Sequence, residues 1–423
     1  MCVILSLRFF GLFLVMPILA AAALKLEGAT PFLAGLAVGS YALMQMIFQY
    51  PFGMLSDRFG RKRMIAAGMI IFAAGSIICA QSTDIWFLII GRFVQGMGVV
   101  TSVITAGISD LTSEDQRSKA MAFMGVSIAC SFTAAIPLSP VIGGAFGVES
   151  LFWISACLVI PTIFLLIFAV KTPPKIHPLE PIVGSKLKRV FADSDLMRLN
   201  CAMFLHSFVM TSSFVMIPLA LTRELGYEIG CMWRIYLPAL ACGVLAMGLG
   251  TAIGEKKNAV KKVMLFGITA LICAYAGLLL SGILLIPWVM LIFAGLNSLE
   301  PLMQSSASKL ARSDVRGAAL GLFNAFQFCG VFAGGVGAGV AYDRMGAAGI
   351  AAVLLVVSSI WFIITLRLKN PVKTVTIRVE FDTARTQKEI EEINGVIEAY
   401  RSEKLYIRYD PAVIDGDTLR GRL

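Results

Sequence analysis

The sequence predicts an all-α membrane protein with twelve transmembrane helices and a small α/β domain at its C-terminal end. Of its 423 residues, 58% are hydrophobic, and its mean hydropathy of +0.82 exceeds that of a soluble globular protein. A transmembrane helix needs about 20 apolar residues, and twelve runs of roughly this length follow one another. After residue 370 the composition changes abruptly.

The twelve expected helices fall into two groups of six. Their expected ranges are 2–24, 31–53, 63–82, 85–109, 119–146, 150–170, 197–221, 231–253, 262–282, 284–308, 317–341 and 347–368. A polar segment, 171–195, separates the groups, and its four prolines indicate a cytoplasmic linker. We therefore expect one six-helix half over 1–170 and another over 196–370, an organisation typical of pseudo-symmetric transporters.

The first apolar run is expected to be a membrane helix and not a secretory signal. It lacks a basic beginning, carries Arg8 within it and is followed by eleven more spans. We expect its opening turns to be missing from this sequence.

Lys and Arg gather in every second loop of the predicted bundle. The loops after spans two, four, six, eight and ten hold Arg58, Arg61, Lys62, Arg63, Arg117, Lys119, Lys171, Lys175, Lys186, Lys188, Arg189, Lys256, Lys257, Lys261, Lys262, Lys309, Arg312 and Arg316. Since basic residues favour the cytoplasmic side, both termini are expected in the cytoplasm. The net charge of +10 comes from these membrane-flanking loops, so we expect no nucleic-acid partner.

The loop between spans two and three, residues 53–63, reads GMLSDRFGRKR. It resembles the major facilitator superfamily signature G-x-L-x-D-R-x-G-R-K, with matches at Gly53, Leu55, Asp57, Arg58, Gly60, Arg61 and Lys62. The resemblance implies a transporter with the twelve-helix major facilitator fold. The corresponding loop between spans eight and nine, GEKKNAVKK, is basic but otherwise degenerate.

Three charged residues are expected to meet at the cytoplasmic surface. Asp57 ends span two, Arg61 follows four residues later, and Asp110 ends span four. Such a cluster would hold the cytoplasmic side shut in the outward-facing state and dissolve when a proton binds. The residues of this expected lock are Gly53, Asp57, Arg58, Gly60, Arg61 and Asp110. The alternative is a basic loop that serves topology alone.

Few titratable side chains lie at membrane depth, where an unpaired charge is unfavourable. They are Arg8, Arg92, Glu300 and His206, and we predict that they couple transport to protons. Glu300 is the only carboxylate among them, so it is the expected proton carrier, with a permanent ion pair to an arginine as its alternative. For Arg8 the alternative is a snorkelling helix-end arginine. For His206 it is a hydrogen-bonded core histidine.

Arg92 and Gln95 lie three residues apart in GRFVQG, which places both on one helix face. The segment resembles the superfamily element R-x-x-Q-G, which is associated with coupling in proton-driven members. Other polar residues recur at helical spacing and are expected to line a cavity: Tyr41, Gln45 and Gln49; Asn297, Glu300 and Gln304; Asn324 and Gln327. Hydrogen bonding between helices is the alternative role for these residues.

Span five indicates the direction of transport. Its segment AIPLSPVIGG resembles the element g-x-x-x-G-P-x-x-G-G of antiporters that export, matching at Pro140, Gly143 and Gly144. Ala135 and Ser139 replace two glycines, so export is favoured on a partial match. The nine cysteines are dispersed and show no metal-ligand spacing. We therefore expect no metal and no cofactor.

The residues after span twelve, 371–423, predict a small cytoplasmic domain. Segments 373–381, 395–400 and 405–409 are expected to be strands, 385–394 a helix, and the residues from Asp415 onward the start of a second helix. The order resembles a ferredoxin-like domain without its metal-binding cysteines and without its last strand, so we expect the domain to be truncated.

Together these features resemble the drug:proton antiporter group of the superfamily. The resemblance implies a monomeric, multi-pass protein of the bacterial cytoplasmic (inner) membrane that is not an enzyme. Its partners would be the lipid bilayer, protons and a small amphipathic substrate that it exports by alternating access. A proton-coupled importer of a sugar or metabolite, and a membrane sensor that moves no substrate, stay open as alternatives.

Overall fold

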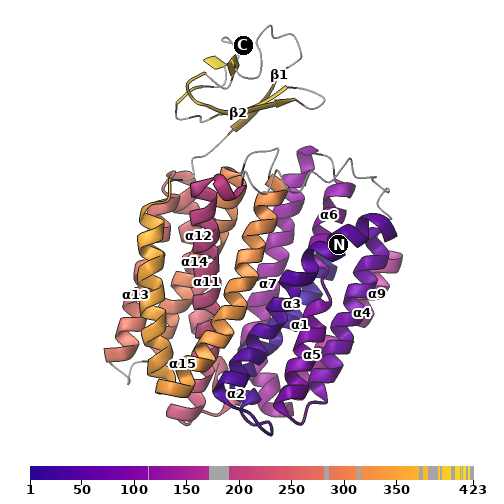
Figure 1. Cartoon of the computed structure of the whole chain (residues 1–423), viewed down its shortest axis with the longest axis vertical. Helices are drawn as coiled ribbons and strands as arrows, with labels where there is room; N and C mark the ends of the chain where they lie inside the picture. Colours follow the sequence, from indigo (N-terminus) through magenta and orange to yellow (C-terminus); the bar gives the residue numbers. More distant parts are fainter. Residues whose placement is uncertain are drawn as a thin grey trace.

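The computed structural model describes residues 1–112, 114–170, 190–280, 285–311 and 316–370, and parts of the C-terminal segment: 375–379, 389–390, 393–401, 405–409, 411, 413–415 and 418–419. The helices form one bundle, and a small sheet lies beyond one of its ends (Figure 1). We call that end of the bundle the sheet end and the opposite end the far end. The helices of residues 1–170 are the first group, and those of residues 190–368 are the second group.

The first group contains six crossings of the bundle. They are α1 (Cys2–Val15) with α2 (Leu19–Ala23), α3 (Pro31–Phe59), α4 (Arg61–Ala80), α5 (Ile85–Met97) with α6 (Thr101–Leu111), α7 (Glu114–Phe146), and α8 (Val148–Cys157) with α9 (Val159–Phe168). Two helix starts are capped by side chains as their sequence suggests. Thr30 Oγ1 accepts from Leu33 N at 3.2 Å, and Asp84 Oδ1 accepts from Phe87 N at 2.9 Å.

The second group also makes six crossings. They are α11 (Ser194–Leu219) with the π-helical turn η1 (Ala220–Glu224), η2 (Ile229–Cys231) with α12 (Trp233–Lys256), α13 (Val260–Leu280), α14 (Leu285–Leu310), and the two parts of α15 (Arg316–Leu366). Helix α15 breaks at Gly346, where φ is 64° and ψ is −157°. This left-handed backbone region favours glycine, and it lets residues 347–366, the last part of α15, return to the sheet end.

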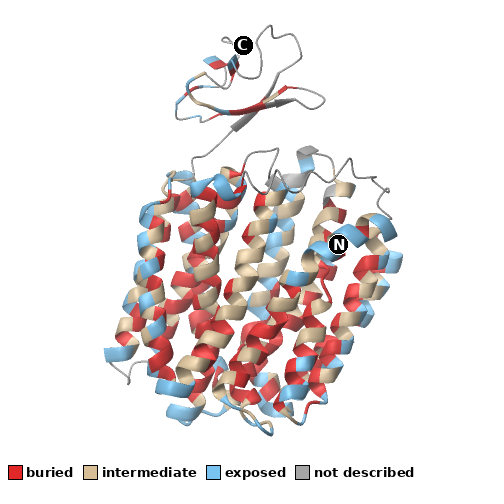
Figure 2. Cartoon of the chain, in the orientation of Figure 1, coloured by how far each residue is buried: buried red, intermediate tan, exposed pale blue. Residues whose placement is uncertain are grey.

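The observed helices confirm the predicted twelve-helix membrane fold. Ten described segments are long and apolar enough to cross a bilayer, with α15 counted once and α1 left out as too short. Counting α15 as two crossings and α1 with α2 as one gives twelve. Large apolar side chains are exposed on the helices, among them Phe168, Phe266 and Leu280, and exposed residues occur along the outside of the bundle (Figure 2). Such surface requires a lipid environment, so the chain is a multi-pass membrane protein.

The two groups touch closely at the far end. Tyr236 of α12 donates to Pro17 O at 3.0 Å, and Phe32 N donates to Asp343 Oδ2 at 3.2 Å. Between α3 and α15, a side chain at Gly35 would overlap the backbone of Gly335. Because glycine has no Cβ, the two helix backbones come into direct contact here, and the far end of the bundle is closed.

The C-terminal strands form the sheet expected of a ferredoxin-like domain. Strands β1 (Val375–Val379), β2 (Val396–Arg401) and β3 (Leu405–Tyr409) lie in the order β1-β3-β2, with β3 antiparallel to both neighbours. Most of the predicted helix over 385–394 lies outside the described residues. Among the residues that are described, no group of His, Cys, Asp and Glu could hold a metal ion.

A buried arginine attaches this sheet to the bundle. Arg408 of β3 donates from Nη1 to Ala311 O at 3.2 Å and from Nη2 to Lys309 O, at the last turn of α14. Its Nη1 also lies 4.0 Å from Glu398 Oε2, and both side chains are buried. The carbonyls at a helix C-terminus carry partial negative charge, so the guanidinium caps α14 and holds the sheet against it.

We expect Arg408→Gln to loosen the sheet from the bundle, because it removes the cation beside buried Glu398 and takes donors from the end of α14. Spin labels at exposed Ser308 and Ile397, with the nine native cysteines replaced, would report a broadened distance distribution. Arg367→Gln, at an exposed position near the end of α15, is the matched control. An unchanged distribution in Arg408→Gln would show that other contacts hold the sheet.

Candidate functional site

An apolar pocket lies where α7 of the first group meets α11 and α14 of the second. Its lining residues are Phe132, Met210, Ser213, Phe214, Ile217, Ile292, Phe293, Leu296, Asn297 and Glu300. The space between them measures about 360 Å³ when the solvent at its open mouth is included, so the enclosed part is small.

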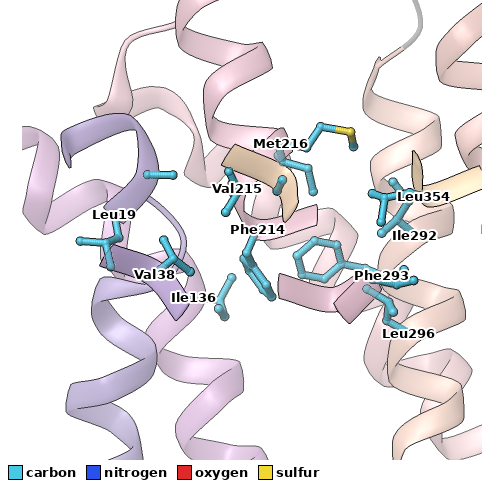
Figure 3. Packing of buried hydrophobic residues seen from close by; sticks show 14 of the residues in the cluster. Leu19, Val38, Ile136, Phe214, Val215, Met216, Ile292, Phe293, Leu296 and Leu354 are labelled. Atoms are coloured by element: carbon cyan, nitrogen blue, oxygen red, sulfur yellow. The ribbon is translucent and has the colours of Figure 1, made fainter. Parts of the chain in front are cut away.

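Three aromatic rings connect the two groups through this pocket. The ring centroids of Phe132 and Phe214 are 6.3 Å apart, and those of Phe214 and Phe293 are 5.9 Å apart, both edge to face. Figure 3 shows Phe214 and Phe293 facing each other, with Leu296 on the Phe293 side and Ile136 of α7 on the Phe214 side. These rings offer the surface for an apolar or aromatic ligand.

Glu300 is the one charged residue among those that line the pocket. It is half-buried and, within the described part of the chain, takes part in no ion pair. The alternative of a permanent pair with an arginine therefore has no support in this structure. Asn297, one turn away, donates from Nδ2 to Phe293 O at 2.9 Å. The carboxylate of Glu300 is left to interact with a proton or a ligand.

Both terminal nitrogens of Arg8 are hydrogen-bonded within the first group, and its Nε has no partner in the described part of the chain. Its Nη2 donates to Tyr41 OH at 2.8 Å and to Gly98 O at 3.0 Å, and its Nη1 donates to Thr101 Oγ1 at 3.3 Å. The side chain is buried, so it does not snorkel to the membrane surface. Arg8 thereby joins α1 and α3 to the break between α5 and α6.

Arg92 forms a second buried network with Gln95. Its Nη1 donates to Gln95 Oε1 at 2.7 Å, and its Nε donates to Ala37 O at 3.1 Å. Gln95 donates to Ser76 Oγ at 2.9 Å, and Gln45 donates to Gly96 O at 3.0 Å. Arg92, Gln95 and Gln45 thus bond neighbouring helices of the first group, which is the alternative role named for the polar stripes. A coupling role for Arg8 and Arg92 stays a prediction.

His206 lies inside the second group, beside the pocket. Its Nε2 donates to Leu296 O at 3.2 Å, and its ring meets Trp361 edge to face at 5.7 Å. Leu296 and Glu300 are one helical turn apart on α14. The structure therefore places His206 about one helical turn from Glu300 and the two arginines in the first group.

The other predicted cavity residues have varied surroundings. Gln304 is exposed, Gln49 is half-buried on α3, and Asn324 and Gln327 are half-buried on α15. None of these four lines the pocket described above, which takes Asn297 and Glu300 from the predicted set. Whether they line a wider path for a substrate stays a prediction.

The three charged residues of the expected lock, Asp57, Arg61 and Asp110, do meet at the sheet end. Arg61 Nη1 lies 2.5 Å from Asp57 Oδ1, and Arg61 Nε lies 3.0 Å from Asp110 Oδ2. Arg61 also donates to Ser56 Oγ. All of these residues belong to the first group, and the cluster is formed while the far end of the bundle is closed. Any effect of this cluster on the exchange between the outward-facing and inward-facing states would therefore act through the packing of α3, α4 and α6.

The remaining signature residues shape the turn between α3 and α4. Gly60 ends α3 and begins α4 with φ of 94°, a conformation that other residues rarely adopt. Arg58 is exposed and lies over the ring of Phe59 at 5.6 Å. A side chain at Gly53 would meet no other residue, and nothing in this structure explains that glycine.

The antiporter-like element of span five lies on α7 at the contact between the groups. Pro140 is within the helix. A side chain at Gly143 would overlap Ile18 of the first group, and one at Gly144 would overlap the backbone of Gly230 of the second group. The Gly144 position thus adds to the closure at the far end, and its relation to export stays a prediction.

The sequence alone did not reveal the aromatic wall of the pocket. Phe132, Phe214 and Phe293 are three of 28 phenylalanines, and the lipid-facing ones look the same in the sequence. The one available signal was position, since Phe293 lies two helical turns from Glu300 on the same helix.

Comparison with known proteins agrees with this architecture. Residues 1–335 match the family described as Major Facilitator Superfamily. The inner membrane transport protein YajR of Escherichia coli is 32% identical over 97% of this chain and 93% of its own length. Multidrug resistance protein 2 of Bacillus subtilis is 25% identical over 79% of this chain and 86% of its own length. The inward-facing, unoccupied crystal structure of a bacterial homologue of the human lysosomal transporter Spinster has a TM-score of 0.68 at 16% identity, covering 86% and 95% of the two chains.

We expect Arg61→Gln to destabilise the first group, because Asp57 and Asp110 would lose the cation that lies between them. The three side chains are 12–35% exposed, so we expect a loss of about 1–2 kcal/mol, less than for a fully buried pair. Thermal unfolding in detergent measures it as a lower Tm. Arg58→Gln is the control, and an equal drop in both variants would rule out a special role for the cluster.

Proposed function

This chain is a member of the Major Facilitator Superfamily, and we propose that it exports small amphipathic compounds in exchange for protons across the cytoplasmic membrane of a bacterium. The proposed transporter acts as a monomer, with both termini in the cytoplasm. It needs no cofactor, because the proton gradient supplies the free energy.

The observation that carries this proposal is the pocket with aromatic walls and one carboxylate. Seven of its ten lining residues are apolar, and Ser213, Asn297 and Glu300 supply its polar groups. A sugar would need many hydrogen-bond partners, since each buried hydroxyl without a partner is unfavourable. An amphipathic cation or neutral drug needs an apolar wall and few polar contacts. The pocket therefore favours the exporter over an importer of sugars.

Two further observations support export of such compounds. A relative of similar length is named a multidrug resistance protein, and α7 carries the partial antiporter element at Pro140, Gly143 and Gly144. With the sheet end in the cytoplasm, the far end faces outward and is closed by Gly35 and Gly335. In this state the pocket receives its substrate from the inside.

The proposed cycle uses Glu300 twice. With the outer side closed, the Glu300 carboxylic acid releases its proton toward the cytoplasm, and the resulting carboxylate favours binding of a cationic or polar substrate. After the groups rock and the outer side opens, a proton from outside joins the carboxylate, weakens its hold on the substrate and promotes release. One proton thus enters for each binding event at Glu300.

We expect Glu300→Gln to abolish proton-driven export while the protein still folds, because glutamine has the size of glutamate but no exchangeable carboxyl proton. In vesicles that contain a pH-sensitive dye, ethidium should evoke proton movement with the wild type. This movement should fall about tenfold or more in the variant, a barrier increase of at least ~1.4 kcal/mol.

The control is Glu228→Gln, which removes an exposed carboxylate outside the pocket. Exchange of labelled for unlabelled ethidium needs no net proton transfer and should persist in Glu300→Gln. If the variant retained proton coupling, Glu300 would not be the carrier. If the wild type moved no proton with ethidium or any of a panel of neutral drugs, the export proposal itself would fail.

A further inference from the structure

Buried polar atoms without hydrogen-bond partners are concentrated between two helices of the second group. Of nine such side-chain atoms in the described residues, six belong to α11 and the last part of α15. They are Asn200 Nδ2, His206 Nδ1, Thr211 Oγ1, Ser358 Oγ, Trp361 Nε1 and Thr365 Oγ1. Buried polar groups nearly always have a partner, and where protein supplies none an ordered water does.

The two helices run side by side from the sheet end inward. At the sheet end, Lys369 N donates to Asp195 Oδ1 at 3.4 Å, and deeper in the bundle the rings of His206 and Trp361 meet at 5.7 Å. Asn200 and Thr365 lie between these two points, about 6–8 Å in from the Asp195 contact by helix rise. Ser358 follows Trp361 on the same face of α15, one turn further in. We call Asn200, Thr365, Trp361, Ser358 and His206 the polar track.

The unpartnered atoms of His206 and Trp361 are chemically complementary. Since Leu296 O can only accept, Nε2 of His206 carries the hydrogen, and Nδ1 of the neutral ring is an acceptor without a donor. Trp361 Nε1–H is a donor without an acceptor. A water between the two rings that accepted from Trp361 and donated to His206 would satisfy both groups.

The polar track leads to the carboxylate of the pocket. The hydrogen bond from His206 to Leu296 O places the imidazole one helical turn from Glu300 on α14. The outer end of the track lies at Asp195, whose carboxylate is 11% exposed and sits 3.4 Å from the Lys369 ammonium. The track therefore lies within the second group and extends from about one helical turn from Glu300 to the sheet end.

We propose that the polar track holds ordered water and releases the proton of Glu300 to the cytoplasm, along a route separate from the substrate pocket. This inference rests on the proposed function. The Glu300 carboxylic acid gives its proton to the track water, which passes it, with Nδ1 of His206 as a transient acceptor, to bulk water at Asp195. Glu300 is left as a carboxylate and His206 returns to its neutral form, so the proton leaves without displacing an incoming substrate.

Radiolytic labelling tests for the water directly. A brief X-ray pulse turns bound water into hydroxyl radicals, and mass spectrometry then locates the oxidised side chains in the reconstituted full-length protein. We expect rapid oxidation of Trp361 and His206, although both are buried. Tyr236 is equally buried, its hydroxyl donates to Pro17 O, and it should stay unmodified. Oxidation of Trp361 no faster than that of Tyr236 would overturn the proposal.

A substitution tests the role in proton release. Thr365→Val keeps the side-chain shape and removes the hydroxyl from the track, and Asn200→Leu removes a second polar group. Ethidium-evoked proton movement should slow about tenfold or more, as when a proton relay is lost, while exchange of labelled ethidium is unchanged. The control is Thr162→Val, since the Thr162 hydroxyl is buried in α9 and donates to Leu158 O at 2.7 Å.

Each outcome has a separate meaning. Labelled Trp361 together with unimpaired proton movement in Thr365→Val and Asn200→Leu would show a hydrated track that carries no protons, and would overturn the proposal. Absence of proton movement in the wild type itself would instead overturn the proposed function, and with it the role of the track in proton release.

Discussion

The structure depends on how polar groups inside a lipid-embedded bundle find partners. Arg8 and Arg92 are the extreme cases, because each guanidinium is buried and has no carboxylate beside it among the described residues. Backbone carbonyls and the side chains of Tyr41, Thr101 and Gln95 take the place of a counterion. These bonds link α1, α3 and the α5–α6 break within the first group. In transporters built from two such halves, alternating access is largely a rigid-body movement of one half against the other.

The second group satisfies its polar groups differently. It holds no buried arginine in its described helices, and its internal polar atoms are amide, hydroxyl, imidazole and indole groups, several without a protein partner. The carboxylate of Glu300 stands at the edge of this group and faces the aromatic wall. The two halves of the bundle therefore differ in their internal polar groups. The first holds two buried arginines bonded to several helices, and the second holds the carboxylate that lines the pocket.

Much of this organisation could be predicted from the sequence. Span lengths, basic loops and the signature at 53–63 carry local signals, so the twelve crossings and the meeting of Asp57, Arg61 and Asp110 follow from spacing along the chain. The pocket could be predicted only in part. Glu300 is conspicuous as a carboxylate in an apolar run, but the rings of Phe132 and Phe214 approach it through tertiary packing. In a lipid-facing protein apolar residues occur on every helix face, and periodicity therefore does not tell a pocket wall from a lipid-facing one.

Helix α14 connects the pocket to the C-terminal sheet. Glu300 lies in its middle, Lys309 near its end bonds Glu255 of α12 at 2.5 Å, and the last carbonyls accept from Arg408 of β3. An α-helix transmits a rigid displacement along its axis over these few turns. Any rocking of the second group must therefore either carry the sheet along or break the Arg408 contact. Arg408 and Glu398 are both buried. Separation of the sheet from α14 would therefore expose two charged side chains at once. The sheet is thus attached to the second group at the end of α14, the helix that also carries Glu300.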